Sequence, residues 1–167
     1  MKVLVTGATG FIGSALVAGL VNAKRFGVRA SVRHEVSKLP QDTEQFVTGD
    51  LTPDTDFQRA LADVDIVVHL AARAHVMQDK AANPLAEFRQ LNVGGTLNLA
   101  RQSAAAGIRR FIFISSVKVN GEATFPGCPY VADDAPAPTD AYGISKMEAE
   151  RGLCALASET GMEVVII

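Results

Sequence analysis

Residues 2–13 read KVLVTGATGFIG, a short β-branched run that leads through three glycines into a stretch with helical spacing. Gly7, Gly10 and Gly13 form a G-x-x-G-x-x-G pattern between the predicted strand and the predicted helix. A pyrophosphate at a helix N-terminus lies against backbone N–H groups, and a Cβ at the turn would block that approach. The alternative is a tight turn that binds nothing, but the strand before the glycines and the helix after them favour a dinucleotide-binding turn.

Strands and helices alternate along the rest of the chain. The apolar periodicity predicts strands at 2–6, 28–32, 45–48, 65–70, 110–115 and 163–167, and helices at 14–23, 57–61, 83–106 and 141–159. Parallel strands need crossover connections, and these are usually helices. The sequence therefore predicts an α/β protein with a Rossmann-type doubly wound parallel sheet and helices on both faces.

Composition narrows the range of partners. The 167 residues carry a formal net charge of -2, so we expect neither nucleic acid nor a membrane surface as a partner. The N-terminus lacks the basic flank and apolar core of a secretory signal, which favours a cytoplasmic protein. Cys128 and Cys154 are then expected to be reduced thiols, and because they do not form a metal-spaced cluster we expect no metal site.

The residue at the end of the second strand of such a fold usually selects the cofactor. An acid there binds the ribose 2′-hydroxyl of NAD, whereas a nearby arginine suits the 2′-phosphate of NADP. This chain has Arg33 at that place and no carboxylate before Glu35. We therefore expect NAD or NADP, with NADP slightly favoured by Arg33; the alternative is that Arg33 is an ordinary surface residue.

Tyr142 and Lys146 form a Y-x-x-x-K pattern at the start of a predicted helix. Residues four apart share a helix face, so the ammonium of Lys146 can lie beside the phenol of Tyr142. A neighbouring cation favours the phenolate, and we expect it to lower the pKa of Tyr142 toward the range useful for proton transfer. Thr139 or Asp140 can cap this helix.

Other polar residues are expected at the same edge of the sheet. Ser115 and Ser116 end a predicted strand at its carboxyl edge, where open α/β folds bind ligands. Ser116 can donate a hydrogen bond to a substrate oxygen on which charge develops. Asn92 lies inside the predicted helix 83–106, a position that does not favour Asn, and we expect it to hold backbone or water near the site. Each of these residues taken alone is also compatible with a structural role.

Six motifs now occur in one order along nearly the whole chain: TGATGFIG at 6–13, GDL at 49–51, HLAA at 69–72, LNVGGT at 91–96, FIFISSVKVNGE at 111–122 and YGISK at 142–146. Together they resemble the N-terminal portion of an extended short-chain dehydrogenase/reductase, in the NAD(P)-dependent nucleoside-diphosphate-sugar epimerase family and similar to UDP-glucose 4-epimerases. The resemblance implies one NAD(P)-binding Rossmann domain over 1–167. Because no element follows the last strand, we expect the C-terminal substrate domain of this family to be absent from this chain.

The resemblance also implies roles for individual residues. Asp50 and Leu51 would contact the adenine, and Ala71 and Ala72 would line the nicotinamide side. Ser116, Tyr142 and Lys146 would be the catalytic triad, with Tyr142 as the acid/base. The complete expected cofactor site comprises Gly7, Gly10, Phe11, Ile12, Gly13, Arg33, Asp50, Leu51, Leu70, Ala71, Ala72, Asn92, Ser115, Tyr142 and Lys146.

The family performs several reactions that share a hydride transfer between a sugar carbon and nicotinamide. By resemblance, the dehydratases of this family carry an Asp-Glu pair soon after the catalytic hydroxyl residue. Here residues 117–119 read VKV and contain no acid, which disfavours dehydration. Asn120 also stands where the family usually has tyrosine. The likeness favours epimerisation of a nucleoside-diphosphate sugar, of the 4-epimerase type, through transient hydride transfer.

Two alternatives remain open at this point. Arg33 favours an NADPH-dependent 4-keto nucleotide-sugar reductase of surface-polysaccharide synthesis. A non-catalytic dinucleotide sensor is the second alternative, and the presence of Ser116, Tyr142 and Lys146 together disfavours it. By resemblance, the helix after Asn83 and the helix of Tyr142 could pair in a homodimer. Without a substrate domain, we expect the chain to bind dinucleotide without turnover.

Overall fold

The computed structural model describes residues 1–74 and 83–167, and within these residues the strands form one six-stranded parallel sheet in the order β3-β2-β1-β4-β5-β6. The strands are β1 (Lys2–Thr6), β2 (Gly27–Val32), β3 (Thr43–Val47), β4 (Ile66–His69), β5 (Arg110–Phe113) and β6 (Glu163–Ile166). The predicted doubly wound parallel sheet is confirmed. Its strand order reverses between β1 and β4, the place where such sheets bind ligands beyond the carboxyl ends of their strands.

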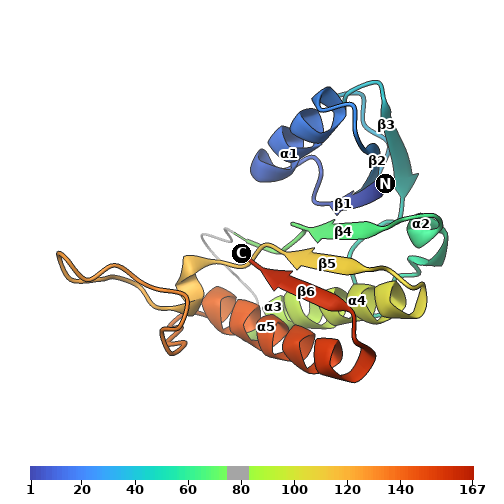
Figure 1. The fold of residues 1–167 in the computed structure, drawn as a ribbon. Helices are drawn as coiled ribbons and strands as arrows, with labels where there is room; N and C mark the ends of the chain where they lie inside the picture. The colour runs from blue at the N-terminus through green and yellow to red at the C-terminus, as the bar shows by residue number, and fades with distance from the viewer. Residues whose placement is uncertain (75–82) are drawn as a thin grey trace.

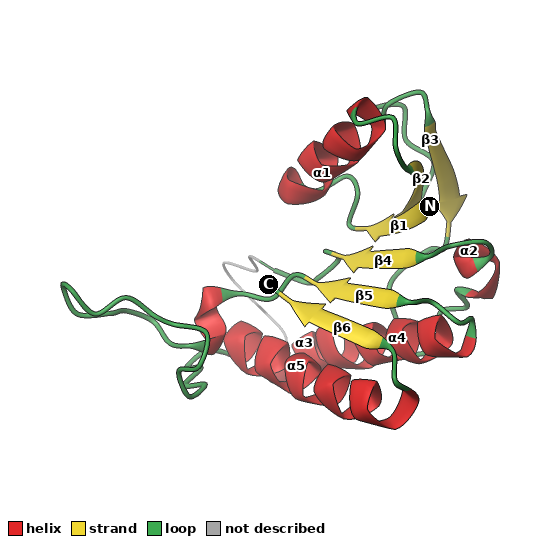
Figure 2. Ribbon diagram, viewed as in Figure 1, coloured by secondary structure: helices red, strands yellow, loops and turns green. Residues whose placement is uncertain are grey.

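Helices cover both faces of this sheet, as predicted (Figure 1, Figure 2). One helix, α1, packs against β1 and β2 on one face, whereas α4 and α5 run along the other face beneath β4, β5 and β6. The helical segments are α1 (Phe11–Asn22), α2 (Gln58–Leu61), α3 (Pro84–Phe88), the π-helix η1 (Arg89–Gly95), α4 (Thr96–Ala105), the 3₁₀ turn η2 (Val117–Val119) and α5 (Ala141–Thr160).

Successive side chains of β1 enter two different apolar cores, because neighbouring residues of a strand point to opposite faces. Val5 packs in the core that contains Val17 of α1. Leu4 packs in the other core, which contains Leu99 of α4 and Leu153 of α5. All five side chains are fully buried. The sheet is thus held from both sides at the strand that leads into the glycine turn.

The predicted helical stretch 83–106 is confirmed, but its middle forms the π-helix η1 between α3 and α4. A Cβ on Gly94 would come within 2.7 Å of the side chain of Pro53, and a Cβ on Gly95 within 2.7 Å of the side chain of Leu51. The two glycines allow η1 to lie against the loop that follows β3. This tertiary contact involves residues far apart in sequence, so local periodicity could not predict it.

The other predicted bounds differ mostly by one or two residues from those of the structure. The larger difference is at α1, which begins at Phe11 rather than at Ser14. Gly10 has an extended backbone and is the N-cap of α1, and it has no side chain to cap the helix. The helix therefore begins inside the glycine turn, and its first backbone N–H groups are available for a ligand.

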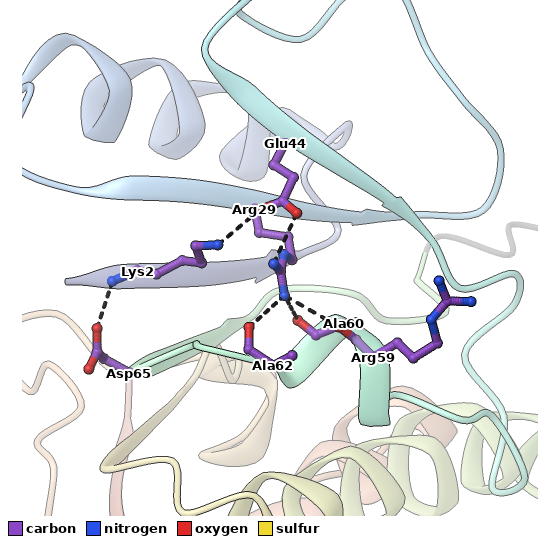
Figure 3. A network of polar contacts seen from close by, with 7 residues as sticks. All are labelled: Lys2, Arg29, Glu44, Arg59, Ala60, Ala62 and Asp65. Atoms are coloured by element: carbon purple, nitrogen blue, oxygen red, sulfur yellow. Dashed lines mark hydrogen bonds and ion pairs between the residues drawn. The ribbon is translucent and has the colours of Figure 1, made fainter.

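A buried arginine joins three strands to the short helix α2 (Figure 3). Nη1 of Arg29, on β2, donates to the carbonyl oxygens of Ala60 at 2.7 Å and Ala62 at 2.8 Å, at the C-terminal end of α2. Its Nη2 donates to Glu44 of β3 at 2.9 Å, and Lys2 of β1 reaches the same carboxylate at 3.3 Å. The hydrogen bond from Arg29 holds the pKa of Glu44 below its usual value. Arg29 thus satisfies carbonyl groups that the end of a helix leaves unpaired.

The loop between η2 and α5, residues 121–140, projects away from the body of the protein (Figure 1). Cys128 in this loop and Cys154 on α5 are both exposed and form no disulfide. Over the described ranges 1–74 and 83–167, none of the helices combines the length and the apolarity needed to cross a bilayer.

Candidate functional site

A cleft of about 480 Å³ opens at the carboxyl edge of the sheet, where the strand order reverses. It is lined by the glycine turn after β1, the ends of β2 and β3, and the loop after β4. The residues of the expected cofactor site that line it are Gly7, Gly10, Arg33, Asp50, Leu51, Leu70, Ala71 and Ala72. The sequence interpretation missed other lining residues, among them Thr6, Thr9, Ser31, Thr48, Phe57, Arg73 and Leu91. The hydroxyl residues Thr6, Ser31 and Thr48 lie at the carboxyl ends of strands, which is a signal that could have found them.

The glycine turn allows three pieces of backbone to lie unusually close together. A Cβ on Gly7, which has a φ of 68°, would come within 2.7 Å of the backbone nitrogen of Ala71. A Cβ on Gly13 would come within 2.1 Å of the carbonyl oxygen of Gly7. Phe11 and Ile12 follow in the first turn of α1, and the side chain of Phe11 is 97% exposed. The turn thus presents an open helix N-terminus beside the cleft, as a phosphate-binding turn requires.

Arg33 and Asp50 lie together at the end of the cleft formed by β2 and β3. Their Nη1 and Oδ1 atoms are 3.8 Å apart, and each side chain is 74% exposed, so this ion pair contributes little stability. Beneath them the hydroxyl groups of Ser31 and Thr48 are 2.8 Å apart and hydrogen-bonded. β2 ends at Val32, directly before Arg33, so neither residue at this strand end is a carboxylate that could bind the ribose of NAD.

A fully buried histidine supports the loop that follows β4. His69 Nδ1 is 2.6 Å from the hydroxyl of Thr6, and its Nε2 is 2.9 Å from the hydroxyl of Thr96 on α4. The same hydroxyl of Thr6 accepts a hydrogen bond from the backbone N–H of Ala71 at 3.3 Å. Burial, with a smaller effect of Lys146, lowers the pKa of His69 to about 3, so the imidazole is neutral at physiological pH. His69 therefore joins β1, β4 and α4 through uncharged hydrogen bonds.

Asn92 lies in η1, and its side chain forms hydrogen bonds with backbone groups, as expected. Its Oδ1 accepts from the backbone N–H of Arg73 at 2.8 Å, and its Nδ2 donates to the carbonyl of Arg73 at 3.1 Å. The same Nδ2 donates to the hydroxyl of Ser145 on α5 at 3.0 Å. One buried amide therefore connects the loop that lines the cleft with the helix that carries Tyr142. The structure places Asn92 behind this loop and not on the wall of the cleft.

Ser116 and Tyr142 come together where η2 packs against the start of α5. Asp140 caps α5 by accepting from the backbone N–H of Gly143 at 2.6 Å, which is one of the two expected caps. A Cβ on Gly143 would come within 2.6 Å of the carbonyl oxygen of Lys118, so glycine is required for this close approach. The hydroxyl of Ser116 lies near enough to the phenol of Tyr142 to lower its pKa, and it also accepts from the backbone N–H of Lys118 at 3.3 Å. Two of the three expected triad members are thus neighbours, because η2 packs against α5.

Lys146 does not act on Tyr142 as expected. Its side chain is buried, and Nζ donates to the carbonyl oxygen of Ile114 at 2.6 Å and lies 3.8 Å from the ring centroid of Phe113. Burial raises the pKa of Tyr142 above its usual value, the nearby hydroxyl of Ser116 opposes this effect, and the charge of Asp140 adds to it. The expected lowering of the Tyr142 pKa by Lys146 is therefore wrong for this arrangement. The amine of Lys146 donates to a carbonyl that follows β5 and not to the phenol of Tyr142.

The expected residues thus fall into two neighbouring groups, one on the walls of the cleft and one at the start of α5. Residues 3–167 match the sequence model of the NAD dependent epimerase/dehydratase family. The chain belongs to this family. The resemblance inferred from the motifs is confirmed. Solved structures of similar proteins share the fold of this chain, with TM-scores of 0.84 and 0.83.

Relatives within the epimerase/dehydratase family include nucleotide-sugar epimerases. A UDP-glucose 4-epimerase of Vibrio cholerae is 52% identical over 166 residues, which cover 99% of this chain and 50% of that protein. The structure of a UDP-glucuronic acid 4-epimerase from Bacillus cereus in complex with NAD has a TM-score of 0.84 and 26% identity, covering 99% of this chain and 55% of its own. The UDP-glucose 4-epimerase of Thermotoga maritima with UDP-glucose has a TM-score of 0.83 and 28% identity, covering 99% and 54%. The chain spans about half the length of these relatives.

Proposed function

We propose that the protein takes part in the 4-epimerisation of a nucleoside-diphosphate sugar through transient hydride transfer to a nicotinamide dinucleotide. The observation that supports this proposal is that Ser116, Tyr142 and Lys146 lie after β5 and at the start of α5, at the carboxyl edge of the sheet that also carries the cleft. The Vibrio cholerae relative and the Thermotoga maritima structure, both UDP-glucose 4-epimerases, support a UDP-sugar as the substrate class.

The cleft fits a dinucleotide. Gly7 and Gly13 leave room that a Cβ would fill, and the open N-terminus of α1 supplies backbone donors for a pyrophosphate. Leu51 would line the adenine side, whereas Ala71 and Ala72 would line the nicotinamide side. The bound dinucleotide would supply a reversible hydride acceptor.

The residues beside the cleft would move the proton that accompanies the hydride. Tyr142 would accept the proton of the sugar 4-hydroxyl as the C–H hydride leaves, and it would return the proton when the hydride adds to the other face of the carbonyl. Ser116 would donate a hydrogen bond to the same sugar oxygen. Because burial keeps the phenol protonated, the proton-accepting form needs a positive charge nearby, and Lys146 lies one helical turn away. Lys146 would also bind the ribose of the cofactor.

An assay of the complete gene product with UDP-glucose tests this proposal. We expect NMR spectra to show interconversion of two sugar epimers with no net change in oxidation state of the cofactor. Conversion of a 4-keto sugar with stoichiometric release of NADP⁺ would instead identify a reductase. Tight dinucleotide binding with no turnover on any UDP-sugar would contradict both enzymatic functions and favour a sensor.

A second candidate function rests on Arg33. It lies on the wall of the cleft, and the end of β2 carries no acid for the ribose of NAD, so we propose that this site also accepts the 2′-phosphate of NADP. An NADPH-dependent 4-keto nucleotide-sugar reductase would use that preference. The phosphate would compete with Asp50, which is the present partner of Arg33.

Replacement of Arg33 by alanine separates the two cofactors. We expect Arg33→Ala to weaken binding of NADP about tenfold or more, because a charge-assisted bond to the 2′-phosphate is lost, and to change binding of NAD little. Titration calorimetry measures both affinities. Arg25→Ala is the matched control, since Arg25 is exposed in the turn before β2 and far from the carboxyl edge. Equal losses for NAD and NADP would contradict a role of Arg33 in selecting the cofactor.

We also propose that residues 1–167 form the NAD(P)-binding domain, and that recognition of the sugar needs a C-terminal substrate domain outside this chain. We further propose that two copies of the protein form a homodimer through the α3–α4 segment and α5. We also propose that the protein is cytoplasmic.

A further inference from the structure

Glu150 occupies a place on α5 for which neither the motifs nor the proposed mechanism gives a reason. It follows Lys146 by one helical turn, as Lys146 follows Tyr142, so the three residues form one stripe on α5. The hydroxyl of Ser115, which follows β5, donates a hydrogen bond to Oε1 of Glu150. Ser115, which was expected to bind the cofactor, therefore directs its hydroxyl to a half-buried carboxylate on α5.

The same contact lies beside the buried ammonium of Lys146. Ile114, whose carbonyl accepts from Lys146 Nζ at 2.6 Å, directly precedes Ser115. Lys146 is 2% exposed, and burial lowers its pKa to about 8, while the charge of Glu150 opposes this effect. A buried cation with only a carbonyl and an aromatic ring beside it is costly unless a negative charge lies near.

Among the described residues, the carboxylates on the elements packed against α5 are Glu87 of α3 and Glu163 of β6, and these are paired with Arg73 and Arg110. His69 on β4 is neutral, and Tyr142 is protonated. Arg89 of η1 forms an ion pair with Glu148, so that carboxylate is already paired. Lys118 of η2 similarly pairs with Glu122 and Asp140 at the start of α5.

We propose that Glu150 is a positioning residue that provides the negative charge for Lys146 and, through Ser115, fastens the end of β5 to α5. This proposal rests on the proposed function, in which Lys146 binds the cofactor. Glu150 touches neither substrate nor cofactor in this proposal. Its effect is to keep the ammonium charged and in place at the working pH.

Replacement of Glu150 by glutamine tests the charge directly. We expect Glu150→Gln to lower the pKa of Lys146, measured by NMR of labelled lysine side chains in residues 1–167, by about one unit. Because the ammonium exists below its pKa, the alkaline loss of affinity for the dinucleotide should also begin about one unit lower. Glu148→Gln is the matched control on the same helix, and we expect it to leave the pKa of Lys146 unchanged. An unchanged pKa in Glu150→Gln would overturn the proposal.

Replacement of Ser115 by alanine tests the hydrogen bond that joins the end of β5 to Glu150 on α5. It also provides a second test if Glu150→Gln does not fold. This change keeps the carboxylate but frees it to turn toward water, so we expect a smaller fall of the Lys146 pKa in the same direction. No fall in Ser115→Ala would overturn the anchoring role. If the wild-type chain binds no nicotinamide dinucleotide, the proposed function fails, whereas the order of Lys146 pKa values still tests the role of Glu150.

Discussion

Replacing Tyr142 with phenylalanine is expected to reduce turnover of a UDP-sugar by the complete gene product by about a hundred- to ten-thousand-fold. Phenylalanine keeps the ring that packs edge-on against Phe88, with ring centroids 6.1 Å apart, and removes only the hydroxyl. The proton of the sugar hydroxyl then has no acceptor in hydrogen-bond reach. We expect the affinity for NAD or NADP, measured by titration of residues 1–167, to change little, because the cleft itself is not altered.

The chain offers a matched control for this experiment. The sequence contains two tyrosines, and the other, Tyr130, lies in the projecting loop, where its hydroxyl donates to the carbonyl of Ala123 at 2.9 Å. Tyr130→Phe should therefore retain turnover. Within residues 1–167, Tyr130→Phe also leaves Tyr142 as the only phenol, so the ultraviolet absorbance of this chain reports the titration of Tyr142 and should show a raised pKa. Turnover by Tyr142→Phe near the wild-type rate would show that another group moves the proton.

Replacing Gly13 with alanine is expected to destabilise the fold by about 3 kcal/mol and to abolish dinucleotide binding. The new Cβ would lie 2.1 Å from the carbonyl oxygen of Gly7 and 3.0 Å from the Cα of Ala8. Both neighbours are backbone atoms, so the overlap is relieved only by moving α1 away from the glycine turn. Such a movement takes the helix N-terminus away from the place where it would meet the pyrophosphate.

Gly19 provides the control for Gly13, because it lies in the same helix. It is exposed, and a Cβ there would meet nothing within 4 Å. We expect Gly19→Ala to stabilise the fold by about 0.5–1 kcal/mol, since alanine loses less backbone entropy than glycine in a helix. Urea unfolding and dinucleotide titration of both variants measure the two effects. Equal behaviour of the two variants would contradict the close approach of α1 to the glycine turn.

Much of the fold could be predicted because its signals are local. β1, Gly10 and α1 form one strand–turn–helix unit whose residues are adjacent in the chain, and the alternation of strands with helices specified a parallel sheet. The positions of Ser116 after β5 and of Tyr142 at the start of α5 were also predicted, because both follow from spacing along the chain. The π-helix was not predicted, because Gly94 and Gly95 meet Pro53 and Leu51 only after the chain has folded.

The orientation of the Lys146 side chain at the candidate site likewise could not be predicted from the local sequence. By itself the sequence determined the sheet, the glycine turn and the position of Lys146 one turn from Tyr142, because these depend on periodicity and spacing along the chain. Only the tertiary structure decided that the amine donates to Ile114, that burial raises the pKa of the phenol, and that Glu150 and Ser115 meet beside them. The physical reason is that burial and charge–charge distances arise when β5 and α5 pack together, and no spacing within either segment contains them.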